Sequence, residues 1–129
     1  MSKVKNITPV YDLVLNQGED TRIQLHLSEE EDGKRTEINI EGFTFTCKVR
    51  EEAGDESQIL TASFTILDQR HGLVELYFKA EDTTALILEG AYYGSMTKYT
   101  YDIFMKDING DEQRILCGHC YISPSVSNR

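Results

Sequence analysis

Apolar and polar residues alternate along most of this chain in short segments, and turn-forming residues separate one segment from the next. In the clearest example, "FTFTCKVR" at residues 43–50, every second side chain is apolar. Successive side chains of a strand point to opposite faces, so this pattern is typical of a strand with one buried face. The same pattern predicts strands at residues 10–15, 21–27, 36–42, 43–50, 59–67, 73–78, 98–106 and 114–123. The chain is therefore predicted to be all-β, a sandwich or a barrel.

Polar segments that contain Gly, Asp and Asn connect these predicted strands. "SEEEDGKR" at residues 28–35 carries the longest run of like charge and is predicted to be a solvated loop. Asn109-Gly110 predicts a hairpin between the last two strands, with both residues able to take the positive φ of a tight turn. One short helix is predicted at residues 79–87, packed across one end of the domain. We expect an N-terminal arm over residues 1–9, the sandwich over residues 10–124 and a C-terminal tail over residues 125–129.

A C-x-x-C pattern with an internal histidine occurs near the C-terminus, at Cys117, Gly118, His119 and Cys120. On a strand, residues three apart point to opposite faces, so Cys117 and Cys120 cannot bind one tetrahedral zinc. A redox C-x-x-C pair lies at a helix N-terminus, and no helix is predicted after Cys120. We therefore interpret the cysteines as small apolar side chains, with Cys120 on the core face and Gly118 where a neighbour packs close. The odd number of cysteines, with Cys47 as the third, favours free thiols.

No other motif in the chain predicts catalysis. None of the serines lies in a G-x-S-x-G context, and the chain has no Gly-rich phosphate loop. The carboxylates are scattered over predicted loops, with no pair that could face each other across a cleft. We therefore expect a protein that is not an enzyme, and we assign it no catalytic residue, no metal ligand and no cofactor.

The chain is acidic, with 13 basic and 22 acidic side chains and a net charge of −9. Such a surface repels the phosphate backbone, so no nucleic-acid partner is expected. No apolar run approaches the roughly 20 residues that a membrane helix needs, and the N-terminus does not resemble a signal peptide. We expect no membrane partner and synthesis in the cytoplasm.

Tyrosines are concentrated in the last third of the chain. Tyrosine is common in cores and is enriched among the residues that contribute most to protein interfaces. Tyr92 and Tyr93 lie in a glycine-flanked segment and cannot both point inward from extended backbone. We predict protein contacts at Tyr92, Tyr93 and Tyr99, and also along exposed edge strands and the segment before Tyr11.

Several stretches taken together resemble a known family. They are "LNQGEDTRIQLHL", "GFTFTCKVRE", "ASFTILDQRHGLVELYF", "AEDTTALILEG" and "YTYDIFMKDINGDEQRILCGHCYISPSVS", in this order. The chain is similar, from about Tyr11 to Val126, to the N-terminal domain of tailed-phage baseplate upper proteins and related small tail proteins. This resemblance implies an immunoglobulin-like antiparallel β-sandwich that attaches fibres or receptor-binding proteins to the particle.

The resemblance also implies the setting in which the protein works. It implies a structural virion protein, made in the host bacterial cytoplasm, that binds other virion proteins of the tail, baseplate or fibre in several copies. A capsid decoration or neck protein is an alternative within the same setting. Two alternatives from other classes are a carbohydrate-binding sandwich that uses Tyr92, Tyr93 and Tyr99 as a stacking platform, and a small metal- or thiol-dependent enzyme built on Cys117, His119 and Cys120.

Overall fold

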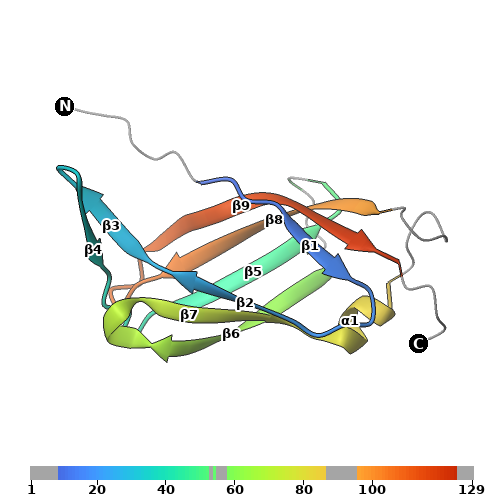
Figure 1. The fold of residues 1–129 in the computed structure, drawn as a ribbon, viewed down its shortest axis with the longest axis horizontal. Helices are drawn as coiled ribbons and strands as arrows, with labels where there is room; N and C mark the ends of the chain where they lie inside the picture. Colours follow the sequence, from blue (N-terminus) through green and yellow to red (C-terminus); the bar gives the residue numbers. More distant parts are fainter. Residues whose placement is uncertain (1–8, 53, 55–57, 87–95, 125–129) are drawn as a thin grey trace.

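β-Strands dominate the computed structural model, which describes residues 9–52, 54, 58–86 and 96–124 (Figure 1). The strands are β1 (Leu13–Asn16), β2 (Thr21–His26), β3 (Ser28–Glu31), β4 (Lys34–Glu37), β5 (Thr44–Arg50), β6 (Leu60–Asp68), β7 (Leu73–Phe78), β8 (Thr97–Lys106) and β9 (Glu112–Ser123). Two short helices are the 3-10 turn η1 (Gln69–His71) and α1 (Ala80–Thr84). The predicted all-β class and the short helix are confirmed, although α1 is shorter than the predicted 79–87.

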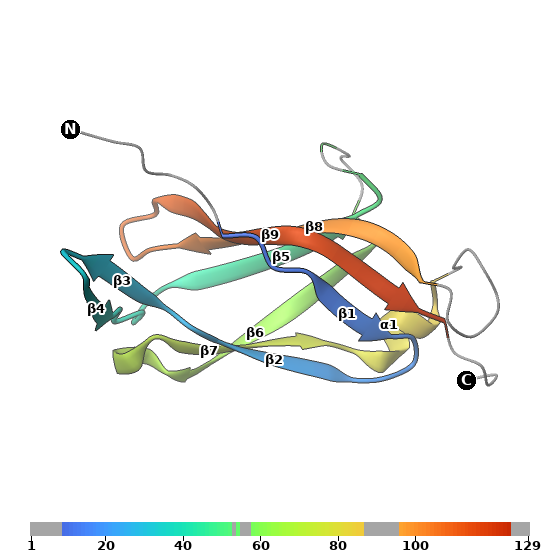
Figure 2. The ribbon, with the colours of Figure 1, turned by 45° about the horizontal axis from the view of Figure 1, so that its top comes forward.

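The main sheet is folded over on itself to form a sandwich-like body. Among the described residues, seven strands are hydrogen-bonded in the order β1-β9-β8-β5-β6-β7-β2. β6 joins the two layers, because its first residues pair with β5 and its later residues pair with β7. One layer therefore contains β1, β9, β8 and β5, and β7 and β2 lie across from it (Figure 2). Residues far apart in the sequence thus enclose one core.

β1 runs parallel to its neighbour β9, with Leu13 beside Cys120 and Asn16 beside Ser123. Every other pair in the main sheet is antiparallel. The expectation of a purely antiparallel sandwich is therefore wrong at this edge. The N-terminal segment runs alongside β9 in the same direction as that strand, toward the end of the body that carries α1, so the two pair in parallel.

A hairpin formed by β3 and β4 replaces the solvated loop predicted at residues 28–35. Asp32 and Gly33 form its two-residue turn, with φ of 55° and 77°. These angles are those of a tight hairpin turn, for which Asp-Gly is a favoured sequence. The run of charged residues around Asp32-Gly33 led to the prediction of a solvated loop instead of this turn. The strand predicted at residues 36–42 is also wrong beyond Glu37, where an irregular link buries Ile40 instead.

The hairpin predicted between the last two strands is confirmed, with a longer turn than two residues. Lys106 pairs with Glu112, so residues 107–111 form the loop. Gly110 has a φ of 91°, whereas Asn109 is outside the positive-φ region. The Asp107 carboxylate accepts hydrogen bonds from the amides of Asn109 (2.9 Å) and Asp111 (3.0 Å), which stabilises the wider turn.

The core lies between the two layers and consists of the alternate side chains that the sequence pattern predicted. On β5, Cys47 and Val49 are buried; on β8, Tyr99, Tyr101, Ile103 and Met105 are buried; on β7, Val74, Leu76 and Phe78 are buried. Leu13, Leu15, Cys120 and Ile122 complete the core beside β1. Apolar burial of this kind provides the main driving force for folding.

One end of the sandwich is closed by α1 and the turn between β1 and β2. Thr83 of α1 is fully buried, and its hydroxyl accepts a hydrogen bond from the Gly18 amide at 2.9 Å. The Asp20 carboxylate accepts a 2.7 Å hydrogen bond from the Ala80 amide, at the first position of the helix. This bond stabilises the charged carboxylate and lowers the pKa of Asp20. Hydrogen bonds from Gly18 and Asp20, in the turn between β1 and β2, therefore hold α1 in its position.

A close contact holds the N-terminal segment against β9. The Tyr101 hydroxyl, from β8, donates a hydrogen bond to the Tyr11 carbonyl. A Cβ at residue 118 would clash with the oxygen of that carbonyl, so only glycine fits there, and Gly118 has a φ of 155°. The Asp12 carboxylate accepts a hydrogen bond from the His119 amide at 3.0 Å. The predicted close approach at Gly118 is confirmed, and we call this set of contacts the Tyr11 clamp.

We predict that Gly118→Ala loosens β1, because the added methyl group overlaps the Tyr11 carbonyl. The free energy of unfolding is expected to fall by about 1–3 kcal/mol, as measured by urea denaturation. Amide hydrogen exchange in Leu13–Asn16 is expected to accelerate. Tyr101→Phe, which removes only the donor, is expected to cost about 1 kcal/mol.

Gly110→Ala is the control for this prediction. It also imposes positive φ on alanine, but nothing lies within 4 Å of the new methyl group. Gly110→Ala is therefore expected to leave exchange in Leu13–Asn16 unchanged. Equal acceleration in both variants would contradict a local role for the Tyr11 clamp.

Candidate interaction site

The two cysteines of the C-x-x-C pattern point to opposite faces of β9, as the strand alternation predicted. Cys120 is completely buried in the core, and Cys117 lies on the outer face. The Cys117 sulfur is 3.9 Å from the Pro9 carbonyl oxygen. His119 also lies on the outer face, where its ring is 6.0 Å from that of Tyr121. The structure therefore does not bring Cys117, His119 and Cys120 together as one site.

The buried thiols lie in an environment that disfavours the thiolate. Burial raises the pKa of Cys120 to about 12, and burial together with the nearby Cys120 and Asp102 raises the pKa of Cys47 to about 12. The thiolate is the form that attacks electrophiles and binds metals. In the described part of the chain, no three His, Cys, Asp or Glu side chains are arranged to hold a metal ion.

Of the three tyrosines predicted to contact a partner, Tyr99 belongs to the core. It is only 7% exposed, because odd-numbered residues of β8 face the other layer. Its predicted contact role is therefore corrected to a packing role. Tyr92 and Tyr93 lie outside the described residues, so the prediction for them stands untested.

Exposed apolar side chains instead gather on the N-terminal edge of the sheet. Val10 is 72% exposed, Tyr11 59% and Val14 59%. We call these three residues the edge stripe. Val14 lies in the edge strand β1, and Val10 and Tyr11 lie in the segment that leads into it; one side of this backbone has no neighbouring strand among the described residues. Isolated apolar side chains are ordinary on a surface, but a group of them along an edge strand is typical of a contact site.

A groove opens beside the edge stripe, at the end of the sandwich opposite α1. β1 pairs with β9 only from Cys120 onward, with one further bridge between Val10 and Cys117. Residues 112–116 of β9 therefore have no strand beside them on that edge among the described residues. The groove has a volume of about 1250 Å³. Its lining includes the apolar Pro9, Leu25, Leu27, Ile115 and Leu116, the acidic Glu29, Glu30 and Asp107, and the basic Arg114.

A smaller basic pocket of about 360 Å³ lies on the outer face of β5, β8 and β9, on the other side of Val10. Lys48 and Arg50 line it, together with His119 and a single carboxylate, Asp102. Cross-strand pairing places Arg50 and His119 on either side of Thr100. Among the described residues, Arg50 Nε and His119 Nδ1 have no hydrogen-bond partner. This pocket is locally positive on an otherwise acidic protein.

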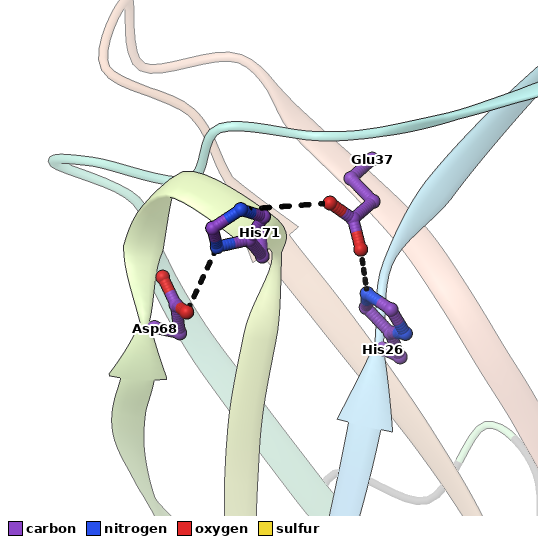
Figure 3. Close-up of polar contacts among 4 residues, drawn as sticks. All are labelled: His26, Glu37, Asp68 and His71. Carbon is purple, nitrogen blue, oxygen red and sulfur yellow. Dashed lines mark hydrogen bonds and ion pairs between the residues drawn. The ribbon is translucent and has the colours of Figure 1, made fainter.

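A chain of carboxylates and imidazoles ties the β3–β4 hairpin to the body (Figure 3). His26 Nε2 is 2.8 Å from one Glu37 oxygen, and His71 Nε2 is 3.9 Å from the other. His71 Nδ1 is 2.8 Å from Asp68 Oδ2. The bond to Asp68, with smaller contributions from the Asp68 and Glu37 charges, raises the pKa of His71. All four side chains are solvent-exposed, and among the described residues no serine or cysteine hydrogen-bonds to either imidazole.

Sequence signals for these features differ in strength. The segment "VYDLVL" has apolar residues on both faces, which is a signal that its outer face is also a contact surface. The four residues of the histidine–carboxylate chain come from β2, β4, β6 and η1, and no local motif links them. The groove exists because β1 pairs with β9 only from Cys120 onward, and the alternation of apolar and polar residues does not predict where that pairing starts.

No protein-family model matches the chain, and a search of curated proteins finds no match. No helix among the described residues is long and apolar enough to cross a membrane.

We predict that Cys47 and Cys120 resist alkylation in the folded protein. At pH 8 their raised pKa values leave almost no thiolate, and burial blocks access to the reagent. Iodoacetamide followed by mass spectrometry is expected to modify both thiols only after denaturation. Cys117, on the outer face, is the internal control for reagent activity. Rapid modification of Cys120 in the folded state would contradict its assignment to the core.

We predict that His71 titrates above the ordinary histidine pKa of about 6.5. Because the folded pKa is the higher one, the His71–Asp68 pair stabilises fully below pH 6.5, and this contribution is lost as pH rises through the folded pKa. At the acid end it is lost as Asp68 protonates, below its ordinary pKa of 3.8. NMR titration should show Asp68→Asn returning the His71 pKa toward its ordinary value. Glu37→Gln should lower it less, and the reverse order would contradict the assigned cause.

Proposed function

We propose that this chain is a non-catalytic structural protein of a tailed-phage virion, an immunoglobulin-like β-sandwich that binds other virion proteins through its N-terminal edge. In this proposal it acts as an adaptor or accessory of the tail or baseplate and is present in several copies. The similarity of its sequence segments to the N-terminal domain of baseplate upper proteins supports the virion setting.

The order of the strands supports the immunoglobulin-like part of the proposal. In that fold, one sheet contains the third, sixth and seventh strands and the other contains the first, second, fourth and fifth. Leaving aside the β3–β4 hairpin, β5, β8 and β9 here form the first of these groups, and β2, β6 and β7 form the second. Two features differ from that pattern: β1 pairs with the last strand instead of joining the second group, and β6 pairs with both groups. The β3–β4 hairpin is an insertion between the second and third strands.

The edge stripe is the observation that carries the interaction role. Val10, Tyr11 and Val14 expose apolar surface on the edge strand β1 and the segment before it, where a partner can add backbone hydrogen bonds to side-chain contacts. The basic pocket adjoins Val10 and contributes Lys48 and Arg50. This combination fits an apolar segment flanked by carboxylates. A partner with that chemistry would bury the stripe and neutralise the pocket.

Other features favour a structural role over the alternatives. Two of the three thiols are buried with raised pKa values, and the exposed imidazoles bond to carboxylates at the base of a hairpin. The burial of Tyr99 removes one of the three rings from the proposed carbohydrate platform. A place on the capsid or neck would use the same edge stripe, because the contact chemistry is the same.

We predict that Val10→Asp together with Val14→Asp reduces incorporation into particles at least tenfold. The two carboxylates replace apolar contacts and repel a partner that carries acidic groups. Incorporation is measured by quantitative mass spectrometry of particles purified after the variant replaces the normal chain. Circular dichroism of the isolated variant is expected to be unchanged, because both side chains are already in water.

Ile108→Asp is the matched control, since Ile108 is 71% exposed and lies in the β8–β9 loop. It is expected to be incorporated normally. Equal loss in the control would remove the edge stripe from the interface. Absence of the unmodified protein from purified particles would overturn the virion role itself.

A further inference from the structure

The basic pocket on the outer face of β5, β8 and β9 contains two donors that no described residue uses. Arg50 Nε and His119 Nδ1 are shielded from solvent, and neither has a hydrogen-bond partner among the described residues. A polar atom in that situation costs stability unless an ion, a water molecule or a ligand satisfies it. We propose that the pocket binds one carboxylate on a short aliphatic stem, with Arg50 and His119 as its donors. That this group is a glutamate side chain of the partner rests on the proposed interaction role.

The register of the sheet places the two donors on either side of one threonine. Arg50 of β5 pairs with Thr100 of β8, which pairs in turn with His119 of β9. Neighbouring strands lie about 4.8 Å apart, so the Cα atoms of Arg50 and His119 are separated by about 10 Å. Both side chains are half-buried and line the pocket, so rotation about their side-chain bonds turns the donors toward the space above Thr100. The Thr100 hydroxyl provides a third donor there.

The guanidinium of Arg50 favours a carboxylate. Its Nε–H and the adjacent Nη–H form a planar fork that matches the two oxygens of a carboxylate. Because Arg50 Nε has no partner among the described residues, the fork on that side can form such a bidentate pair. His119 Nδ1, when it carries a proton, donates to the same group from the strand on the other side of Thr100.

The charges around the pocket favour an anion with a single charge. Three permanent cations line it against one carboxylate: Lys48, Arg50, Arg114 and Asp102. A second carboxylate lies close by, because Asp12 accepts a hydrogen bond from the His119 amide. The chain as a whole carries a net charge of −9. These negative charges oppose the second charge of a phosphate dianion, so a carboxylate fits the pocket better.

The rim of the pocket accounts for the aliphatic stem. Val10 and Cys117 line the pocket beside the cations, and Val10 is 72% exposed. These side chains can cover the methylene groups that carry the carboxylate. The pocket volume of about 360 Å³ lies at the lower end of the range typical of small-ligand sites. Butyrate reproduces a glutamate side chain from its Cα outward and is therefore the probe for this site.

The test is an NMR titration of the isolated chain with butyrate at constant ionic strength. Saturable shifts are expected at Arg50 Nε, at the His119 ring and at the Thr100 amide. Butyramide, the uncharged isostere, is expected to cause no such shifts. Acetate should bind at least threefold more weakly, because it lacks the methylene groups that contact Val10. Shifts that do not saturate, or that chloride reproduces, would overturn the proposal.

Variants separate a built site from a general effect of charge. Arg50→Gln should raise the dissociation constant of butyrate at least fivefold, and Arg50→Lys, which keeps the charge but loses the fork, at least threefold. Lys98→Gln is the matched control, because Lys98 is exposed on the same face of β8, two residues from Thr100. It should change the dissociation constant less than twofold. Equal weakening in the control would overturn the site.

Phosphate at the same ionic strength separates the two classes of anion. It is expected to bind more weakly than butyrate, and tighter binding of phosphate would overturn the assignment to a carboxylate. All of these measurements use the isolated chain. A negative result would therefore leave the virion role and the edge stripe intact, and loss of the virion role would leave the carboxylate site intact.

Discussion

The contact between the Tyr11 carbonyl and the backbone of Gly118 determines how the N-terminal edge of this protein is built. Without a Cβ at position 118, the two backbones approach closely enough for the Tyr101 hydroxyl to bond the same carbonyl. Burial raises the pKa of Tyr101, so its hydroxyl stays protonated and available as a donor. This contact aligns the segment with β9, and Leu13 and Leu15 can then enter the core. The parallel strand and the outward direction of Val10 and Val14 follow from it.

The two ends of the sandwich differ because β1 is short. At one end, the turn after β1 is hydrogen-bonded to α1 through Gly18 and Asp20, which closes the core. At the other end, β1 does not reach the first half of β9, and the groove opens between the layers. An apolar edge and an apolar groove therefore lie on the same side of the molecule.

Much of the fold could be predicted from the period of the sequence. β7 was predicted to the residue, and β2, β5, β6 and β8 were within one residue at each end. The alternation also placed Cys117 and Cys120 on opposite faces. Two of the predictions that were wrong have an identifiable cause. The turn at Asp32-Gly33 was assigned to a solvated loop because charged residues surround it, and Tyr99 was assigned to a contact surface because of its residue type although its position on the strand faces the core. The histidine–carboxylate chain depends on packing between distant segments, which no local pattern records.

In the role that we propose, the edge stripe is buried against another virion protein in the assembled particle. A photo-crosslinking amino acid at position 14 tests it most directly, with position 65, on the exposed face of β6, as the reference. Purified particles irradiated with the probe at position 14 are expected to yield a crosslinked product that contains a second virion protein, and the probe at position 65 should yield none. Crosslinking from position 65 alone, or from neither position with the chain present in the particles, would contradict this claim.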